Sequence, residues 1–127
     1  MERQVIREER GWAGHFVCAH RCHFRRNTLL TCEDIRLVIS TVGLMEDVLS
    51  GKEGKFAKIG CDRYYETMVF HAKYELNRYW DADVNREVSF ESPWYVNRID
   101  GDDIANDQHE AVVQELTNKL AQGIDIS

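Results

Sequence analysis

The pattern of apolar and polar positions predicts strands over most of the chain and a helix at its end. Residues 27–32 and 35–42 are two β-rich runs that flank the polar pair Glu33-Asp34, a pattern typical of a hairpin. The second run has apolar residues at both odd and even positions. Because successive side chains of a strand point to opposite faces, we expect this strand to be covered on both sides.

Two later runs also have strand character. Residues 64–72 carry bulky side chains on both faces and predict a central strand, whereas residues 84–91 alternate apolar with polar positions and predict a half-exposed one. Residues 74–83, between them, are dense in aromatic and acidic side chains, and we interpret them as a turn region. The pattern is weaker over residues 43–60, where we expect a long loop with Met45–Leu49 as one helical turn.

The end of the chain predicts one amphipathic helix of about 20 residues. Apolar residues recur there at helical spacing: Ala105, Val112, Val113, Leu116 and Leu120. Asp100, Asp102 and Asp103 offer N-caps and an acidic first turn, and Gly123 offers a C-cap. Packed on one face of an antiparallel β-meander of about five strands, this helix gives a two-layer α+β fold.

Length and composition indicate an ordinary soluble protein. The 127 residues, 43% hydrophobic and 30% charged, fit a single domain over residues 1–127, with residues 1–10 as an exposed arm. No apolar run approaches the roughly 18 residues of a membrane span, and the charged N-terminus has no signal-peptide core. We therefore expect a cytoplasmic protein with reduced thiols.

The net charge of −6 is unevenly distributed. Residues 1–31 carry six arginines against three glutamates, whereas the rest carries ten basic and nineteen acidic residues. A predominantly acidic protein is a poor nucleic-acid binder, because phosphate neutralisation needs clustered Lys and Arg. The balance suits a partner with a basic surface, such as the groove of a nucleic-acid-binding protein, although mild acidity also serves solubility.

A stretch rich in histidine and cysteine occupies residues 15–23. A hairpin with a three-residue loop around His20 would place Cys18 opposite Cys22, whereas a single straight strand would put all three residues on one face. The sequence leaves both arrangements open. On the straight strand the two cysteines would be about 13 Å apart, too far to share an ion, so only the hairpin allows Cys18, His20 and Cys22 to bind zinc.

Aromatic and acidic residues lie close together in two short segments: Tyr64, Tyr65, Tyr79, Trp80, Asp81 and Asp83. Aromatic rings anchor protein interfaces and carboxylates steer a basic partner, so these residues are a candidate partner-binding surface. The alternative is that the rings only cover the edge of the sheet. The chain contains no phosphate-binding glycine loop, nucleophile elbow or metalloprotease helix motif, which argues against the enzyme classes that depend on them.

Several segments resemble a family of small uncharacterised proteins encoded in bacteriophages and prophages. The resemblance spans most of the chain and is carried by residues 9–16, 24–30, 40–44, 60–68, 80–84 and 90–94. It implies no catalytic residues. It implies instead a cytoplasmic accessory protein in a bacterial host, because small acidic phage proteins often bind and block host defence machinery such as CRISPR effectors and restriction enzymes.

The functional hypothesis that follows is a non-enzymatic protein that binds a host protein and inhibits host defence in the anti-CRISPR or anti-restriction manner. The partner is expected to be a nucleic-acid-binding effector, without direct binding of nucleic acid or membrane by the chain itself; a homodimer is left open. The alternative is a small metal- or thiol-dependent enzyme built on residues 15–23.

Overall fold

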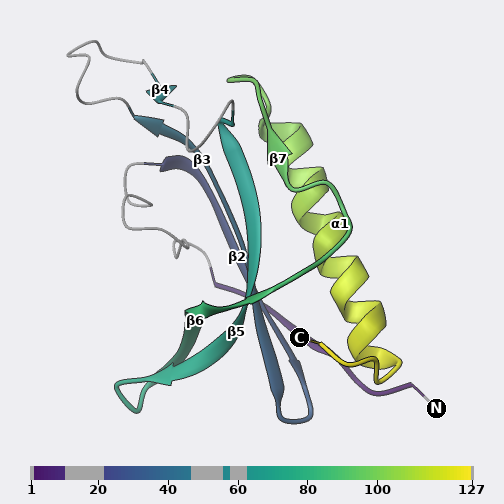
Figure 1. Cartoon of the computed structure of the whole chain (residues 1–127). Coiled ribbons are helices and arrows are strands. Elements are labelled where there is room, and N and C mark those ends of the chain that lie inside the picture. The colour runs from purple at the N-terminus through teal and green to yellow at the C-terminus, as the bar shows by residue number, and fades with distance from the viewer. Residues whose placement is uncertain (1, 11–21, 47–55, 58–62, 127) are drawn as a thin grey trace.

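An antiparallel sheet and one long helix form two layers in the computed structural model, which describes residues 2–10, 22–46, 56–57 and 63–126 (Figure 1). The five main strands lie in the order β1-β2-β3-β5-β6, and the two-residue strands β4 and β7 pair with β3 and β5. The elements are β1 (Ile6–Glu9), β2 (Cys22–Cys32), β3 (Ile35–Glu46), β4 (Phe56–Ala57), β5 (Tyr65–Glu75), β6 (Tyr79–Val88), β7 (Tyr95–Val96) and α1 (Asp102–Ala121). The predicted α+β fold, a meander with a C-terminal helix, is confirmed.

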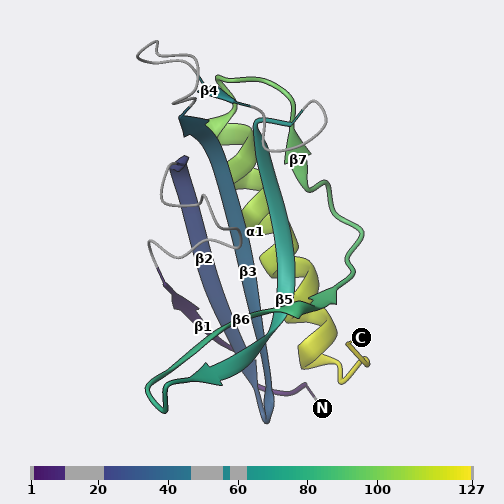
Figure 2. The same cartoon turned by 60° about the vertical axis from the view of Figure 1, so that its left-hand side comes forward.

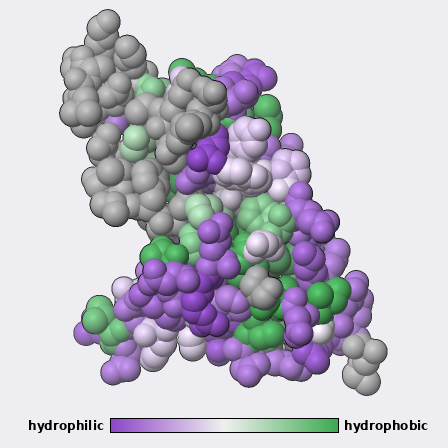
Figure 3. Space-filling view, viewed as in Figure 1, coloured by the Kyte–Doolittle hydropathy of each residue, from purple (hydrophilic) through white to green (hydrophobic). Residues whose placement is uncertain are grey.

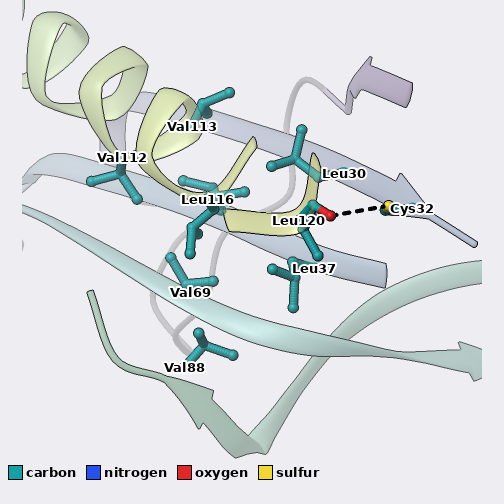
Figure 4. Close-up of a cluster of buried hydrophobic side chains, with 10 residues drawn as sticks. Leu30, Cys32, Leu37, Val69, Val88, Val112, Val113, Leu116 and Leu120 are labelled. Carbon is teal, nitrogen blue, oxygen red and sulfur yellow. Dashed lines mark hydrogen bonds between the residues drawn. The ribbon is translucent and has the colours of Figure 1, made fainter. Parts of the chain in front are cut away.

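The hydrophobic core lies between α1 and the face formed by β2, β3 and β5 (Figure 4). Ten buried residues form it: Leu30, Cys32, Leu37, Ile39, Val69, Val88, Val112, Val113, Leu116 and Leu120. Full burial of each large aliphatic side chain contributes about 1.5–3 kcal/mol. The Cys32 thiol also donates a hydrogen bond to the Leu120 carbonyl oxygen (3.6 Å), which ties the last turn of the helix to β2. Among the described residues, no helix has the length and apolar character needed to cross a membrane.

The predicted hairpin is formed by β2 and β3, in which Cys32 pairs with Ile35 around a two-residue turn. Leu37 and Val38 are both fully buried although they face opposite sides of β3, so the expectation of cover on both sides is confirmed. The expected helical turn from Met45 is wrong for its first two residues, because β3 continues to Glu46 and pairs with β4 there. Residues 47–49 lie outside the described part of the chain.

The interpretation of residues 74–83 as a turn region is also wrong. Tyr74 belongs to β5 and pairs with Trp80 of β6, so that the turn is limited to residues 76–78. The two rings lie 5.2 Å apart between centroids, and such cross-strand aromatic pairs stabilise a sheet. The aromatic residues of this segment therefore belong to β5 and β6 and do not form a turn.

The ends of α1 differ in how their backbone groups are satisfied. Gly101 is the N-cap and no side chain caps the helix, so the predicted aspartate cap is wrong, whereas Asp102 and Asp103 do lie in the first turn. At the C-terminal end, the amide of Ile124 donates to the Lys119 carbonyl (3.0 Å) and Gly123 has φ = 71°. This is a Schellman ending, which favours glycine because the left-handed conformation is strained for other residues.

The N-terminal residues do not form a free arm. Ile6–Glu9 are exposed, but their backbone pairs with β2 as the edge strand β1. Before this strand, the amide of Arg3 donates to the carbonyl of Ala121 (2.8 Å). The beginning of the chain is therefore attached to both layers.

Candidate binding surface

The β5–β6 hairpin folds over the sheet face opposite to α1. Figure 2 shows β1, β2, β3 and β5 side by side, with the helix behind them and the hairpin in front. The pairing register shifts between Phe70 and Ala72, and such an irregularity bends a strand and increases its twist. Beyond this bulge, Ala72 of β5 and Trp80 of β6 pack on Leu29 and Val38 of the underlying strands.

Trp80 anchors the hairpin to the sheet. Its ring packs against Tyr74 on the neighbouring strand, and the guanidinium of Arg36 lies 4.2 Å from its centroid. A cation over an indole ring contributes about 0.5–1 kcal/mol where the site is exposed and more where it is desolvated. Trp80 therefore has an evident structural role, as in the alternative interpretation of the aromatic residues.

The other residues predicted in this segment lie on the outer face of β6. Tyr79, Asp81 and Asp83 alternate along the strand and so share one face, opposite to that of Trp80. Tyr79 is 42% exposed. Lys73 pairs with Asp81 across the hairpin, and its pKa is raised first by a hydrogen bond to Glu75 and further by the charges of Asp81 and Asp83. The face therefore combines an exposed ring with carboxylates in excess.

The tip of the hairpin exposes a leucine on a strained turn. Leu76 and Asn77 both have φ = 54°, and the amide of Arg78 donates to the Glu75 carbonyl (2.9 Å), as in a type I′ turn. The left-handed region costs a non-glycine residue about 1–2 kcal/mol. Leu76 is nevertheless there, and it is 76% exposed. We call Leu76, Tyr79, Asp81 and Asp83 the hairpin surface; in Figure 3 this hairpin, at the lower left, is mainly hydrophilic with hydrophobic atoms near its outer end.

A cleft of about 460 Å³ adjoins the hairpin surface. Its lining includes Leu29 of β2, Glu8 of β1, and Arg78, Tyr79 and Trp80 of the hairpin. The cleft therefore contains aromatic side chains together with charged side chains of both signs. It provides the hairpin surface with a recess into which a partner's side chain can extend.

Tyr64 and Tyr65 do not belong to this surface. Tyr65 is only 1% exposed, and its hydroxyl donates to the Ile99 carbonyl (2.9 Å) and to the Asp102 carboxylate. Burial, and then the hydrogen bond to Asp102, raise its pKa. Tyr64 is half-buried and packs against the same cluster. Both tyrosines lie at the opposite end of β5 from the hairpin, so including Tyr65 in an accessible surface was wrong.

The predicted zinc ligands fall largely outside the described residues. Cys18 and His20 lie there, as does most of the stretch at residues 15–23 on which the enzyme alternative depends. Cys22, at the start of β2, is buried and packs against Val42 and Met45. Within the described part of the chain, no group of three or more His, Cys, Asp or Glu side chains is arranged to hold a metal ion.

His109 forms a buried polar network that the sequence analysis missed. It is fully buried on α1, with Nε2 2.7 Å from the Thr28 hydroxyl and Nδ1 2.7 Å from the Thr41 hydroxyl. Thr41 in turn contacts the Thr67 hydroxyl (2.7 Å), and the Thr28 hydroxyl donates to Glu9 Oε2 (2.9 Å). Burial, reinforced by the charge of Arg26, lowers the pKa of His109 to about 4.

Glu9 and the neutral state of His109 together set the directions of the hydrogen bonds in this network. An ionised carboxylate only accepts, so Thr28 must donate to it and accept the proton of His109 Nε2. The lowered pKa of His109 keeps the imidazole neutral near pH 7, so Nδ1 accepts from Thr41, which accepts from Thr67. Because His109 is inaccessible, the network attaches the helix to the sheet rather than binding a ligand.

The surface end of the network is an ion-pair cluster. Arg7 Nη1 and Nη2 donate to the two carboxylate oxygens of Glu110 (2.8 and 2.7 Å), and Arg26 donates to Glu9 and Glu110 (3.1 and 2.9 Å). Two arginines and two glutamates from β1, β2 and α1 therefore balance one another. The cluster is another contact between helix and sheet, and it leaves the hairpin surface as the candidate for recognition.

Comparison of the chain with protein-family models, with curated proteins and with solved structures finds no match. The fold and the site therefore define the chain only as a two-layer α+β protein with a projecting acidic and aromatic hairpin.

Proposed function

We propose that this protein is a non-enzymatic binding protein that recognises a basic partner protein through the hairpin surface. The observation that supports the proposal is the presence of two exposed apolar or aromatic residues, Leu76 and Tyr79, beside Asp81 and Asp83 on one hairpin. An exposed tyrosine ring next to carboxylates matches an interface anchor with electrostatic steering.

The hairpin is also well suited to bind without large losses of entropy. Trp80 is packed against Tyr74 and Arg36, so the strand that carries Tyr79 and Asp81 is held in place before a partner arrives. Preorganisation of this kind raises affinity because fewer side chains and backbone segments have to be ordered on binding.

The expected partner follows from charge and from the resemblance to phage- and prophage-encoded proteins. That resemblance supports a host protein as partner. Defence effectors of the CRISPR or restriction type bind nucleic acid and therefore present the basic surfaces that acidic residues complement. We therefore propose that the protein inhibits such an effector.

A comparative pull-down tests the binding role. The purified protein is immobilised, exposed to bacterial lysate, and the retained proteins are quantified by mass spectrometry. We expect a basic protein whose retention falls at least roughly tenfold with Tyr79→Ala and with the double variant Asp81→Asn/Asp83→Asn, because each removes interface energy on the order of 1.4 kcal/mol or more. In the wild type, Asp81 Oδ1 accepts a hydrogen bond from the amide of Ala82 (2.8 Å), and asparagine keeps an oxygen that can accept the same bond.

A matched control removes the same two charges elsewhere. Asp107 and Asp125 are exposed on α1 and after it, far along the chain from the hairpin, so Asp107→Asn/Asp125→Asn tests net charge alone. We expect this variant to retain the partner as the wild type does. Equal retention by the Asp81/Asp83 variant and the wild type, or no specific retention at all, would contradict the proposal.

A further inference from the structure

A second cavity lies at the other end of β5, where the sheet ladder is interrupted. β5 pairs with β6 at Val69 and Val88, and with β7 at Tyr65 and Val96. Residues 89–94 connect these two partners outside the ladder, and the amide of Thr67 donates to the carbonyl of Trp94 (2.7 Å) across the gap. The cavity formed there has a volume of about 330 Å³, near the lower limit for small-molecule sites.

Arg63 is the unusual residue of this cavity. Its side chain is 27% exposed, and its guanidinium lies 4.7 Å from the centroid of the Trp94 ring. Its Nε is buried and has no hydrogen-bond acceptor among the described residues, although it forms a long ion pair with Glu66 Oε2 at 3.9 Å. Because this Nε is out of contact with solvent, a ligand in the cavity can reach Arg63 only through the exposed part of its side chain.

The walls of the cavity are held in place. Glu115 of α1 accepts hydrogen bonds from the amides of Glu91 (2.9 Å) and Ser92 (2.9 Å) and from the Ser92 hydroxyl (2.6 Å). Burial acts to raise the pKa of Glu115, but these bonds and that of Lys119 outweigh it and lower the pKa to about 2. Trp94 also packs against Tyr95 in an edge-to-face arrangement, with 5.0 Å between centroids. The cavity is therefore formed before any ligand binds.

The remaining lining combines negative charge with apolar surface. Glu66 and Glu87 contribute carboxylates to a lining that also contains Arg63, whereas Met68 and Phe90 contribute apolar side chains. A simple anion would meet two carboxylates, and a simple cation would meet the guanidinium of Arg63. A zwitterion with an apolar body satisfies both charges and the apolar wall.

We propose that this cavity binds a free α-amino acid with an apolar side chain, whose carboxylate accepts from Arg63 and whose ammonium group faces Glu66 and Glu87. The apolar side chain of the ligand would pack on Met68 and Phe90. The site is separate from the hairpin surface, and it gives the protein a small-molecule ligand that the binding proposal does not require.

Calorimetric titration with three related compounds tests each part of this recognition. We expect L-leucine to bind with a Kd on the order of 1 mM or tighter. N-acetyl-L-leucine lacks the ammonium group and L-leucinamide lacks the carboxylate, so both should bind at least roughly tenfold more weakly, a difference of about 1.4 kcal/mol. Failure of leucine to bind, or equal binding of either analogue, overturns the proposal.

A pair of arginine variants assigns the carboxylate contact. Arg63→Gln should weaken leucine binding at least roughly tenfold, whereas Arg98→Gln removes an exposed guanidinium paired with Asp100 (2.7 Å) and should leave binding unchanged. Thermal unfolding of both variants verifies that they are folded. A folded Arg63→Gln protein that binds leucine as the wild type does would refute the assignment, and this outcome is independent of any result at the hairpin.

Discussion

The buried His109 makes the stability of the fold depend on pH in a defined window. Its pKa is about 4 in the folded protein, against an ordinary value of 6.5 when it is exposed. Between these values the unfolded chain binds a proton that the folded protein excludes, so stability is fully present above about pH 6.5 and is lost as the pH falls towards about 4. Each pH unit in this window costs about 1.4 kcal/mol, and the whole window about 3 kcal/mol.

Carboxylates change the stability in a lower pH range, so their contribution can be separated from that of His109. A hydrogen bond from Arg7 is the main cause that lowers the pKa of Glu110 to about 2, from an ordinary value of 4.5. Its contribution is therefore present above about pH 4.5 and is lost as the pH falls towards about 2. A loss of stability between about pH 6.5 and 5 is thus assigned to histidine rather than to the ion-pair cluster.

The variant His109→Gln removes the titrating group. At about pH 7 we expect it to be less stable than the wild type by about 1–3 kcal/mol, because Thr28 and Thr41 lose well-placed partners. Urea unfolding at several pH values gives the free energy of unfolding for both proteins. Between about pH 6.5 and 5 the wild type should lose about 2 kcal/mol more than the variant, so that the two stability curves approach each other.

His71 supplies the control for this experiment. Its pKa is also lowered, mainly by burial, but it lies in β5 outside the network. The His71→Gln variant should therefore lose nearly as much stability as the wild type when the pH falls below about 6.5. If His109→Gln and the wild type lost stability in parallel, the assignment of a neutral His109 to the network would be wrong.

Two substitutions test the packing that supports the sites. Gly43→Ala should destabilise the protein by about 1–3 kcal/mol, because a Cβ there would lie 2.1 Å from Cδ2 of the buried Tyr65 ring; unchanged urea unfolding would contradict the close approach. Leu116→Ala should cost about 2–5 kcal/mol, because Leu116 is fully buried between helix and sheet, whereas Gln114→Ala on the exposed side should change stability little.

The parts of the fold that were predictable are those with a regular pattern. The β2–β3 hairpin has two β-rich runs around Glu33-Asp34, and α1 has an apolar stripe from Ala105 to Leu120. β1 was not predictable in this way, because its four exposed residues have no apolar alternation and its strand character comes only from pairing with β2. Propensity cannot reveal an edge strand that depends on its neighbour.

His109 was detectable in the sequence. It falls four residues after Ala105 and three before Val112, within the apolar stripe of α1. A polar residue in such a stripe has to find partners when it is buried. Its partners Thr28 and Thr41 lie on two different strands, however, and Thr67 of a third strand completes the network, so only the register of the sheet brings the three threonines together.

The candidate sites were less predictable, because similar residues have different environments. Tyr65 and Tyr79 both lie next to another aromatic residue in the sequence. Tyr65 is buried because Gly43 opposite it leaves room for the ring, whereas Tyr79 is on the outer face of a hairpin that extends beyond the bulge. The residue on the neighbouring strand decides whether such a tyrosine is buried or exposed. The pattern of apolar and polar residues along the sequence does not show which residue that is.

The bulge after Phe70 also separates the two proposed sites. Arg63, Glu66, Thr67 and Met68 line the proposed amino-acid cavity before the bulge, whereas beyond Ala72 the β5–β6 hairpin carries the hairpin surface. Arg63 and Tyr79 share no contact among the described residues, so substitutions at the two positions should have additive effects on the free energy of unfolding. One strand can thus present a small-molecule cavity and a protein-binding surface, with either proposal standing if the other fails.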